Sequence, residues 1–241
     1  MSYFKNFSRV PYSFGNNEAP VLFQNLGTYI DIVDQVKDEV SAYRFYYIKE
    51  GDRPDQLAYL LYEDVNMYWT FFLANDHIRE SGWPLTEEQL VEKVKKDHPD
   101  FVITTQNNLS GIFKVGQTVR GSSSGQTGTI QFRNLDLGQL FISGASGAFL
   151  GSEVVTSQVG SEVQSVTLTG AVEELNSIDH FINGEGKRVD IDPYADAPAL
   201  FTPVTRLEKY RNVNDSLKRI KVLKPNVISQ IAERFREELT S

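Results

Sequence analysis

The chain has 241 residues and a formal net charge of −8, and it contains no cysteine. The absence of cysteine excludes a disulfide-stapled scaffold, a thiolate metal site and a cysteine nucleophile. The acidic balance disfavours nucleic acid and anionic lipid, because phosphate groups are bound mainly by Lys and Arg. The longest apolar runs are far shorter than the roughly 18 residues of a membrane span. We therefore expect protein or carbohydrate partners, and neither nucleic-acid nor membrane binding.

The first of four compositional parts, residues 1–42, begins with aromatic residues placed among Pro11, Gly15 and Pro20. These helix breakers predict an extended N-terminal arm. From Leu26 onward apolar residues recur at helical spacing, which predicts a helix over about 25–42. Because solvated tails normally lack aromatic residues, we expect the arm to lie on its own domain or on a neighbour.

The second part, residues 43–108, is rich in rings, with ten aromatic residues within 43–72. Tyr43–Ile48 predicts a strand, which is closed by a turn at Glu50-Gly51-Asp52. Helical patterns with start signals follow over 54–63, 66–75 and 86–97. We therefore expect a compact, mainly helical core.

The third part, residues 109–170, holds 11 of the 17 glycines and no Tyr or Trp. Its short apolar runs are separated by Gly and Ser, which is typical of strands joined by tight turns. The runs are Ile112–Val115, Gln117–Val119, Thr129–Phe132, Gln139–Ile142, Glu153–Val155 and Val163–Leu168. A repeat at an offset of 35 residues relates Gly116, Val119, Ser122 and Gly125 to Gly151, Val154, Ser157 and Gly160. Two copies of one β-unit would form a small barrel or a pair of stacked hairpins, inserted as a separate module.

The fourth part, residues 171–241, is irregular up to Pro203 and then becomes basic. The basic residues are Arg206, Lys209, Arg211, Lys218, Arg219, Lys221 and Lys224. With Tyr210 as their only interleaved ring, they favour an acidic protein face over nucleic acid. After Pro225 the apolar spacing predicts an amphipathic helix to the C-terminus.

No catalytic or cofactor-binding constellation emerges from the residues. His77, His98 and His180 lack the spacing that places two metal ligands on one helix face, so we expect no metal site. The glycine-rich stretch Gly121–Gly128 lacks a following Gly-Lys-Ser/Thr, which favours a β-turn over a phosphate cradle. No Gly-x-Ser-x-Gly elbow is present. We expect neither enzyme activity nor a cofactor.

Several stretches resemble a known family. Tyr46–Ala58 resembles the opening of a LysM module, in which a strand ends in a Gly-Asp turn and a helix follows at once. Its continuation through Tyr62–Asp76 and Gly82-Trp83-Pro84 is similar to the LysM-like core of the baseplate wedge family named after gene fifty-three of T-even phages. The closing stretch Val204–Leu223 and the start Tyr3–Phe7 also look like this family. The resemblance covers about 1–108 and 171–241. Because the second strand of a LysM module closes the sheet on the first, the resemblance implies that Phe101–Thr105 pairs with Tyr43–Ile48.

The resemblance implies an α+β fold with a LysM-like, mainly helical core, an extended N-terminal arm, an inserted small all-β module and a C-terminal helix. It implies a structural subunit of a contractile-tailed phage baseplate wedge that clamps adjacent wedges together during baseplate assembly. Its partners would be other wedge proteins and copies in neighbouring wedges. Its location would be the tail baseplate of the virion, after assembly in the host cytoplasm.

Two groups of residues are the candidates for function. The first group forms the core or the interface around the LysM-like turn: Tyr46, Tyr47, Gly51, Asp52, Trp69, Phe72 and Trp83. The second group forms a partner-binding tail: Arg206, Arg211, Lys218 and Arg219. Plain core packing for the rings and a solvated face for the basic residues remain open as alternatives.

The alternative function is that of a peptidoglycan-binding LysM module of a cell-wall-targeting protein. LysM grooves hold N-acetylglucosamine polymers in loops that would fall near Gly51–Asp55 and Asn75–Arg79. This alternative predicts exposed rings near the first loop. Binding of insoluble peptidoglycan by the isolated protein would separate the two functions.

Overall fold

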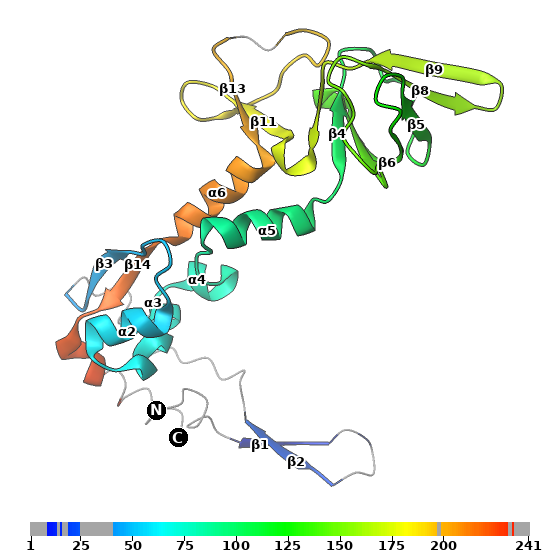
Figure 1. The fold of residues 1–241 in the computed structure, drawn as a ribbon. Helices are drawn as coiled ribbons and strands as arrows, with labels where there is room; N and C mark the ends of the chain where they lie inside the picture. Colours follow the sequence, from blue (N-terminus) through cyan, green and yellow to red (C-terminus); the bar gives the residue numbers. More distant parts are fainter. Residues whose placement is uncertain are drawn as a thin grey trace. The chain divides into compact units, whose positions relative to one another are not determined.

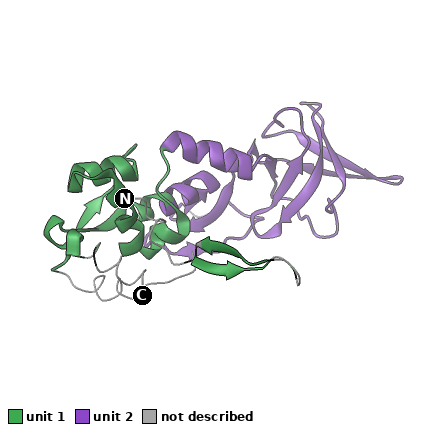
Figure 2. Ribbon diagram, turned by 90° about the horizontal axis from the view of Figure 1, so that it is seen from below, with its two compact units in different colours: residues 1–86, 214–241 green, residues 87–213 purple. Residues whose placement is uncertain are grey.

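The structure is a computed structural model. It describes residues 9–13, 15, 19–24, 41–196, 199–230 and 233. The chain forms two compact units, which Figure 2 shows in different colours. Unit 1 comprises residues 1–86 and 214–241, and unit 2 comprises residues 87–213. Unit 2 is therefore inserted between two stretches of unit 1. No helix among the described residues is long and apolar enough to cross a membrane.

A two-stranded antiparallel sheet joins the two stretches of unit 1 (Figure 1). β3 (Tyr43–Tyr47) pairs with β14 (Arg219–Leu223), so that Tyr47 lies opposite Arg219 and Tyr43 opposite Leu223. The helices that follow β3 are α2 (Pro54–Tyr62), η2 (Val65–Tyr68), α3 (Trp69–Ala74) and α4 (Asp76–Ser81). A hairpin of β1 (Arg9–Tyr12) and β2 (Val21–Gln24) precedes them, and residues 225–230 after β14 are helical.

The helices of unit 1 begin and end at residues suited to those positions. Pro54 occupies the start of α2, where its missing N–H costs no helical hydrogen bond. α2 ends at Glu63, which has a left-handed φ of 58°. Asp64 then caps η2 by accepting a bond from the Asn66 backbone N–H. The apolar sides of these elements meet both strands in one core of Ile48, Leu57, Ala58, Phe71, Ile78, Leu217, Ile220 and Val222.

Two buried asparagine side chains each form two hydrogen bonds to the backbone of one residue, as a neighbouring strand would. Asn75 donates to the Lys221 carbonyl at 2.8 Å and accepts the Lys221 N–H at 2.7 Å. Asn214 donates to the Leu85 carbonyl at 2.9 Å and accepts the Leu85 N–H at 2.8 Å. Each asparagine thus connects the stretch before unit 2 with the stretch after it. Because buried backbone groups need partners, these bonds help to fix the second stretch in place.

Unit 2 contains a seven-stranded antiparallel sheet with the strand order β10-β4-β7-β6-β5-β8-β9. The strands are β4 (Phe101–Thr104), β5 (Thr118–Gly121), β6 (Thr127–Asn134), β7 (Gln139–Ser143), β8 (Val154–Val159), β9 (Glu162–Thr167) and β10 (Gly170–Glu173). Only Leu168 and Thr169 separate β9 from β10, although these strands form opposite edges, so the sheet must curl on itself. Phe113, Ile130 and Leu140 lie in the apolar core that results.

Unit 2 also contains helical segments and a three-stranded sheet, and its last helix ends within the second stretch of unit 1. α5 (Glu87–Asp97), η4 (Glu174–Asn176) and α6 (Arg206–Leu217) contribute Val94, Leu175 and Leu207 to one apolar cluster. β11 (Ile178–Ile182) pairs with both β12 (Arg188–Val189) and β13 (Thr202–Thr205), and η3 (Leu135–Leu137) precedes β7.

The expectation of a mainly helical core is wrong. The described residues form fourteen strands in four sheets, alongside helices of at most 12 residues. The glycine-separated runs pair with Phe101–Thr104 and Gly170–Glu173, so β-structure extends beyond the predicted module. The stretch interpreted as a basic helical tail also contains β13 and β14 on either side of α6.

Two strand assignments are also wrong. Phe101–Thr104 pairs with β7 and β10, whereas the partner of β3 is β14. Ile112–Val115 forms no strand, and Phe113 within it has a φ of 51°, which lies outside the β region. Most of the helix predicted over 25–42 lies outside the described residues, as does most of the arm.

Replacing Asn75 by alanine should destabilise unit 1 by about 2–3 kcal/mol, because the buried backbone groups of Lys221 lose their partners. Chemical denaturation followed by tryptophan fluorescence measures this change, since both tryptophans lie in unit 1. Asn212→Ala, at an exposed position of α6, is the matched control and should change stability by less than about 0.5 kcal/mol. Equal effects of the two substitutions would contradict the role of Asn75.

Candidate functional site

The turn after β3 is held by a carboxylate, a phenol and an indole. Asp52 Oδ2 accepts hydrogen bonds from the Tyr46 hydroxyl at 3.0 Å and from the Lys49 N–H at 2.9 Å. Burial, followed by this bond to Asp52, raises the pKa of Tyr46. The Asp52 carbonyl accepts a bond from Trp83 Nε1 at 2.7 Å. Gly51, with a φ of 82°, supplies the left-handed conformation that the turn requires.

Of the other predicted rings, Trp69, Phe72 and Trp83 face the interior of unit 1, whereas Tyr47 is exposed. Trp69 is buried, and the Trp83 ring lies 6.0 Å from Phe71 and 5.9 Å from Phe72 between centroids. The structure therefore brings Trp83 and Phe72 into contact beside the turn. These rings pack the core that the two stretches of unit 1 share.

The outer face of the β3–β14 sheet carries aromatic and cationic side chains together. The Arg219 guanidinium lies 4.1 Å from the Phe45 ring centroid, and Lys221 Nζ lies 4.7 Å from that of Tyr43. Phe45 is 53% exposed and Tyr47 59% exposed. These five residues share one face because side chains alternate along a strand and because Arg219 and Lys221 lie opposite Tyr47 and Phe45. We call them the ring–cation face.

Two of the predicted tail residues are paired within the chain. Lys218 Nζ lies 2.6 Å from Asp215 Oδ1, and this hydrogen bond raises the pKa of Lys218. Arg211 of α6 donates to Glu87 at the start of α5. Both charges are therefore partly neutralised before any partner binds.

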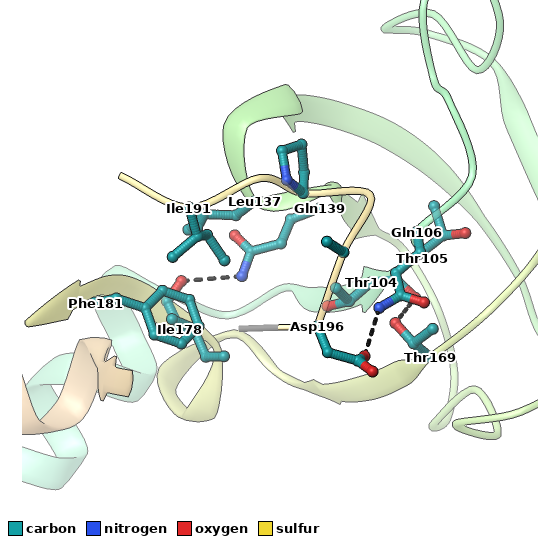
Figure 3. A pocket seen from close by; sticks show the side chains of 12 residues that line it. Thr104, Thr105, Gln106, Leu137, Gln139, Thr169, Ile178, Phe181, Ile191 and Asp196 are labelled. Carbon is teal, nitrogen blue, oxygen red and sulfur yellow. Dashed lines mark hydrogen bonds between the residues drawn. The ribbon is translucent and has the colours of Figure 1, made fainter. Parts of the chain in front are cut away.

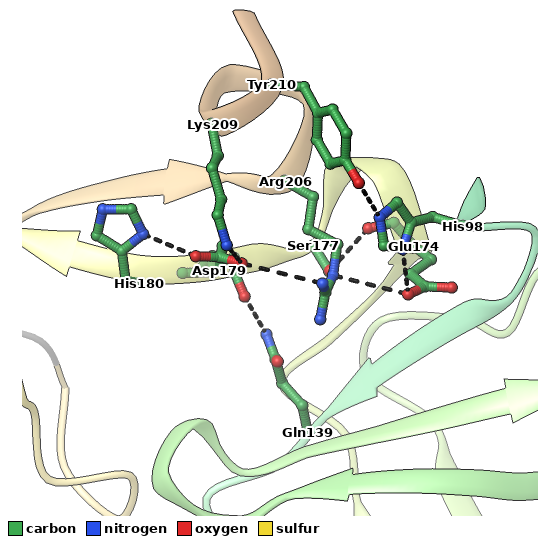
Figure 4. Close-up of polar contacts among 10 residues, drawn as sticks. His98, Gln139, Glu174, Ser177, Asp179, His180, Arg206, Lys209 and Tyr210 are labelled. Atoms are coloured by element: carbon green, nitrogen blue, oxygen red, sulfur yellow. Dashed lines mark hydrogen bonds and ion pairs between the residues drawn. The ribbon is translucent and has the colours of Figure 1, made fainter. Parts of the chain in front are cut away.

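Arg206 lies within a polar cluster of unit 2 (Figure 4). Its Nε donates to Ser177 Oγ at 3.1 Å, and the guanidinium forms ion pairs with Glu174 at 3.8 Å and Asp179 at 3.9 Å. The ring of Phe141 lies 4.9 Å from the guanidinium carbon. With a side chain only 18% exposed, Arg206 compensates two buried carboxylates.

The other polar and charged side chains of this cluster are paired with one another. Burial acts to raise the pKa of Asp179, but hydrogen bonds from Lys209 and His180 outweigh it and lower that pKa. His98 lies between Glu174 Oε1 at 2.9 Å and the Tyr210 hydroxyl at 3.1 Å, as Figure 4 shows. The cluster ties α6 to β11 and to the end of α5.

The glycine-rich stretch encloses a carboxylate of the chain itself. Glu153 accepts bonds from the N–H groups of Ser123, Ser124 and Leu150 at 2.8–2.9 Å and from Ser124 Oγ at 2.7 Å. Burial opposes ionisation, but these four bonds lower the pKa of Glu153. A Cβ on Gly121 would lie 2.6 Å from the carboxylate oxygens, which explains the glycine there. The backbone donors of this turn are thus already occupied.

No metal site accompanies these clusters. Within the part of the chain that the structure describes, no group of three or more His, Asp or Glu side chains is arranged to hold a metal ion.

The candidate residues chosen from the sequence did not include Phe45 or Glu153, and Lys221 was named only as part of the basic run. A signal for Lys221 exists in Arg219-Ile220-Lys221-Val222, where polar and apolar residues alternate with the period of a strand. Glu153 has no local signal, because two of its donors lie 29 and 30 residues earlier in the chain.

Replacing Glu153 by glutamine should lower the free energy of unfolding by about 1–3 kcal/mol at neutral pH. The glutamine amide nitrogen is itself a donor, so it cannot accept the bonds that one carboxylate oxygen accepts from the serine donors. The folded pKa of Glu153 is depressed, so its stabilisation is present above the unfolded pKa of about 4.3 and is lost as pH falls through the folded pKa. Urea unfolding of both proteins from pH 7 downward should therefore show a difference that shrinks in acid. The exposed Glu162→Gln is the control. A difference independent of pH would contradict this role of the carboxylate.

Comparison with known proteins points to one family. Residues 3–98 match the family model described as Base plate wedge protein 53. No curated protein matches the chain. The match confirms, over these residues, the resemblance to the baseplate wedge family that the sequence predicted. The family name indicates a phage baseplate wedge protein.

Proposed function

We propose that this chain, whose residues 3–98 match the baseplate wedge family, joins adjacent wedges during baseplate assembly. The family match is the observation that carries the proposal. We further propose that the ring–cation face is the surface through which the chain binds other wedge proteins or copies in neighbouring wedges. No enzyme activity forms part of this function.

The composition of the ring–cation face supports a role in binding. Aromatic and Arg side chains dominate the energetic centres of protein interfaces. Arg219 and Phe45 already stack on each other, so less side-chain freedom is lost when a partner covers them. Unlike Arg206, whose charge compensates buried carboxylates, Arg219 is exposed. An acidic partner segment would complement the exposed charge of Arg219.

The test is immunogold labelling of phage particles that carry this chain in wild-type form or as the double variant Phe45→Ser, Arg219→Ser. We expect gold in the disc below the sheath for the wild type. For the variant we expect at least about a tenfold loss of labelled particles, because interface residues of these types often contribute 2 kcal/mol or more. Tyr59→Ser with Leu60→Ser, on exposed positions of α2, is the matched control and should assemble normally.

The outcomes separate the functions. Normal assembly of the ring–cation variant would contradict the proposed surface but leave the wedge function intact. Gold absent from wild-type particles, with the protein instead on cell-wall fragments, would overturn the wedge function and favour the peptidoglycan-binding alternative.

A further inference from the structure

Unit 2 contains a cavity that none of the clusters described above uses. It has a volume of about 260 Å³ and lies between β4, β7, β11 and the stretch before Asp196 (Figure 3). Leu137, Ile178, Phe181 and Ile191 supply most of its apolar wall. The exposed residues Ala195 and Asp196 also line it, so the cavity reaches the surface.

One buried polar atom in the cavity wall lacks a partner. Gln139 is only 2% exposed, and its Nε2 donates to the Ile178 carbonyl at 2.9 Å. Its Oε1 is buried and forms no hydrogen bond. The opposite orientation of the amide would place two oxygens against each other, so the nitrogen must face Ile178. Figure 3 shows this amide beside Leu137 and Ile191, in the cavity wall.

Four other polar side chains of the wall form hydrogen bonds within the chain. Thr105 Oγ1 donates to the Thr167 carbonyl at 2.7 Å, and Thr169 Oγ1 donates to the Thr104 carbonyl at 3.2 Å. Gln106 Nε2 donates to Asp196 Oδ1 at 2.9 Å. Gln139 Oε1 therefore lacks a hydrogen-bond donor. A buried acceptor without a donor lowers the stability of the protein.

We propose that this cavity receives one side chain of a partner protein, an apolar ring with a single N–H or O–H donor that bonds to Gln139 Oε1. Sites for drug-sized ligands usually measure about 300–1,000 Å³, so this smaller volume suits a single large side chain. Rings with a polar edge are the usual anchors of protein interfaces. That the ring comes from a partner protein rests on the proposed function; the cavity and its unpaired acceptor do not.

The test uses indole and indene as probes of the isolated full-length protein, followed by NMR chemical shifts. The two molecules have nearly the same shape, but only indole carries an N–H donor. We expect indole to bind saturably with shifts confined to the cavity residues, and indene to bind about tenfold more weakly. Because this comparison uses the unaltered protein, it does not depend on the folding of a variant.

Two variants locate the site. Gln139→Met should abolish the preference for indole over indene, and Ala195→Trp should block both probes at the mouth of the cavity. Gln158→Trp, on the exposed hairpin of β8 and β9, is the control and should bind indole normally.

Equal affinity for indole and indene, shifts elsewhere in the protein, or no saturable binding would each overturn the proposed donor site. None of these results bears on whether the chain lies in the baseplate. Failure of this inference is thus distinguishable from failure of the proposed function.

Discussion

The fold of unit 1 depends on the antiparallel pairing of Tyr43–Tyr47 with Arg219–Leu223. This pairing places the last described strand of the chain beside the first strand of the ring-rich core. Asn75 and Asn214 reinforce it with bonds that bridge 146 and 129 residues of sequence. Without β14, Ile220 and Val222 would leave the shared core, which also holds Phe71 and Ile78.

The insertion of unit 2 is compatible with this long-range closure for two reasons. The entropy of closing a loop grows only with the logarithm of its length, about 0.6 kcal/mol for each doubling. In addition, Arg211 bonds to Glu87, so the two ends of unit 2 lie side by side. Because a folded insert with adjacent ends behaves as a short connection, β3 and β14 can pair across it.

The distribution of basic residues separates structural from exposed charges. Arg206 and Lys209 compensate carboxylates in unit 2, while Lys218 and Arg211 pair with acidic neighbours. Arg219, by contrast, lies exposed over the Phe45 ring and shares its strand with Lys221. Much of the positive charge in this region is therefore used in pairs within the chain, whereas Arg219 is exposed on the two-stranded sheet.

Local features could be predicted from the sequence, whereas long-range pairing could not. Pro54, the Gly51-Asp52 turn and the helical spacing after Thr86 placed α2 and α5 to within about one residue, because caps and turns depend on neighbouring residues. The partner of Tyr43–Tyr47 was missed, because a strand's register depends on its neighbours in space. The donors of Glu153 were missed for the same reason. Phe101–Thr104 was correctly predicted as a strand but assigned to the wrong sheet.

The pairing of β3 with β14 can be tested directly, because the natural chain has no cysteine. Phe45 and Lys221 lie opposite each other, and the Lys221 backbone groups bond to Asn75 on the far side, which makes this a non-hydrogen-bonded pair. The Cα atoms of such pairs lie about 4.5 Å apart, within the range of a disulfide.

The measurement is the yield of intramolecular disulfide after mild oxidation of two variants. Phe45→Cys with Lys221→Cys should close nearly completely. Arg44→Cys with Lys221→Cys should remain reduced, because Arg44 lies opposite Val222 and its side chain points to the other face of the same sheet. Closure of the second pair in place of the first would contradict the fold of unit 1.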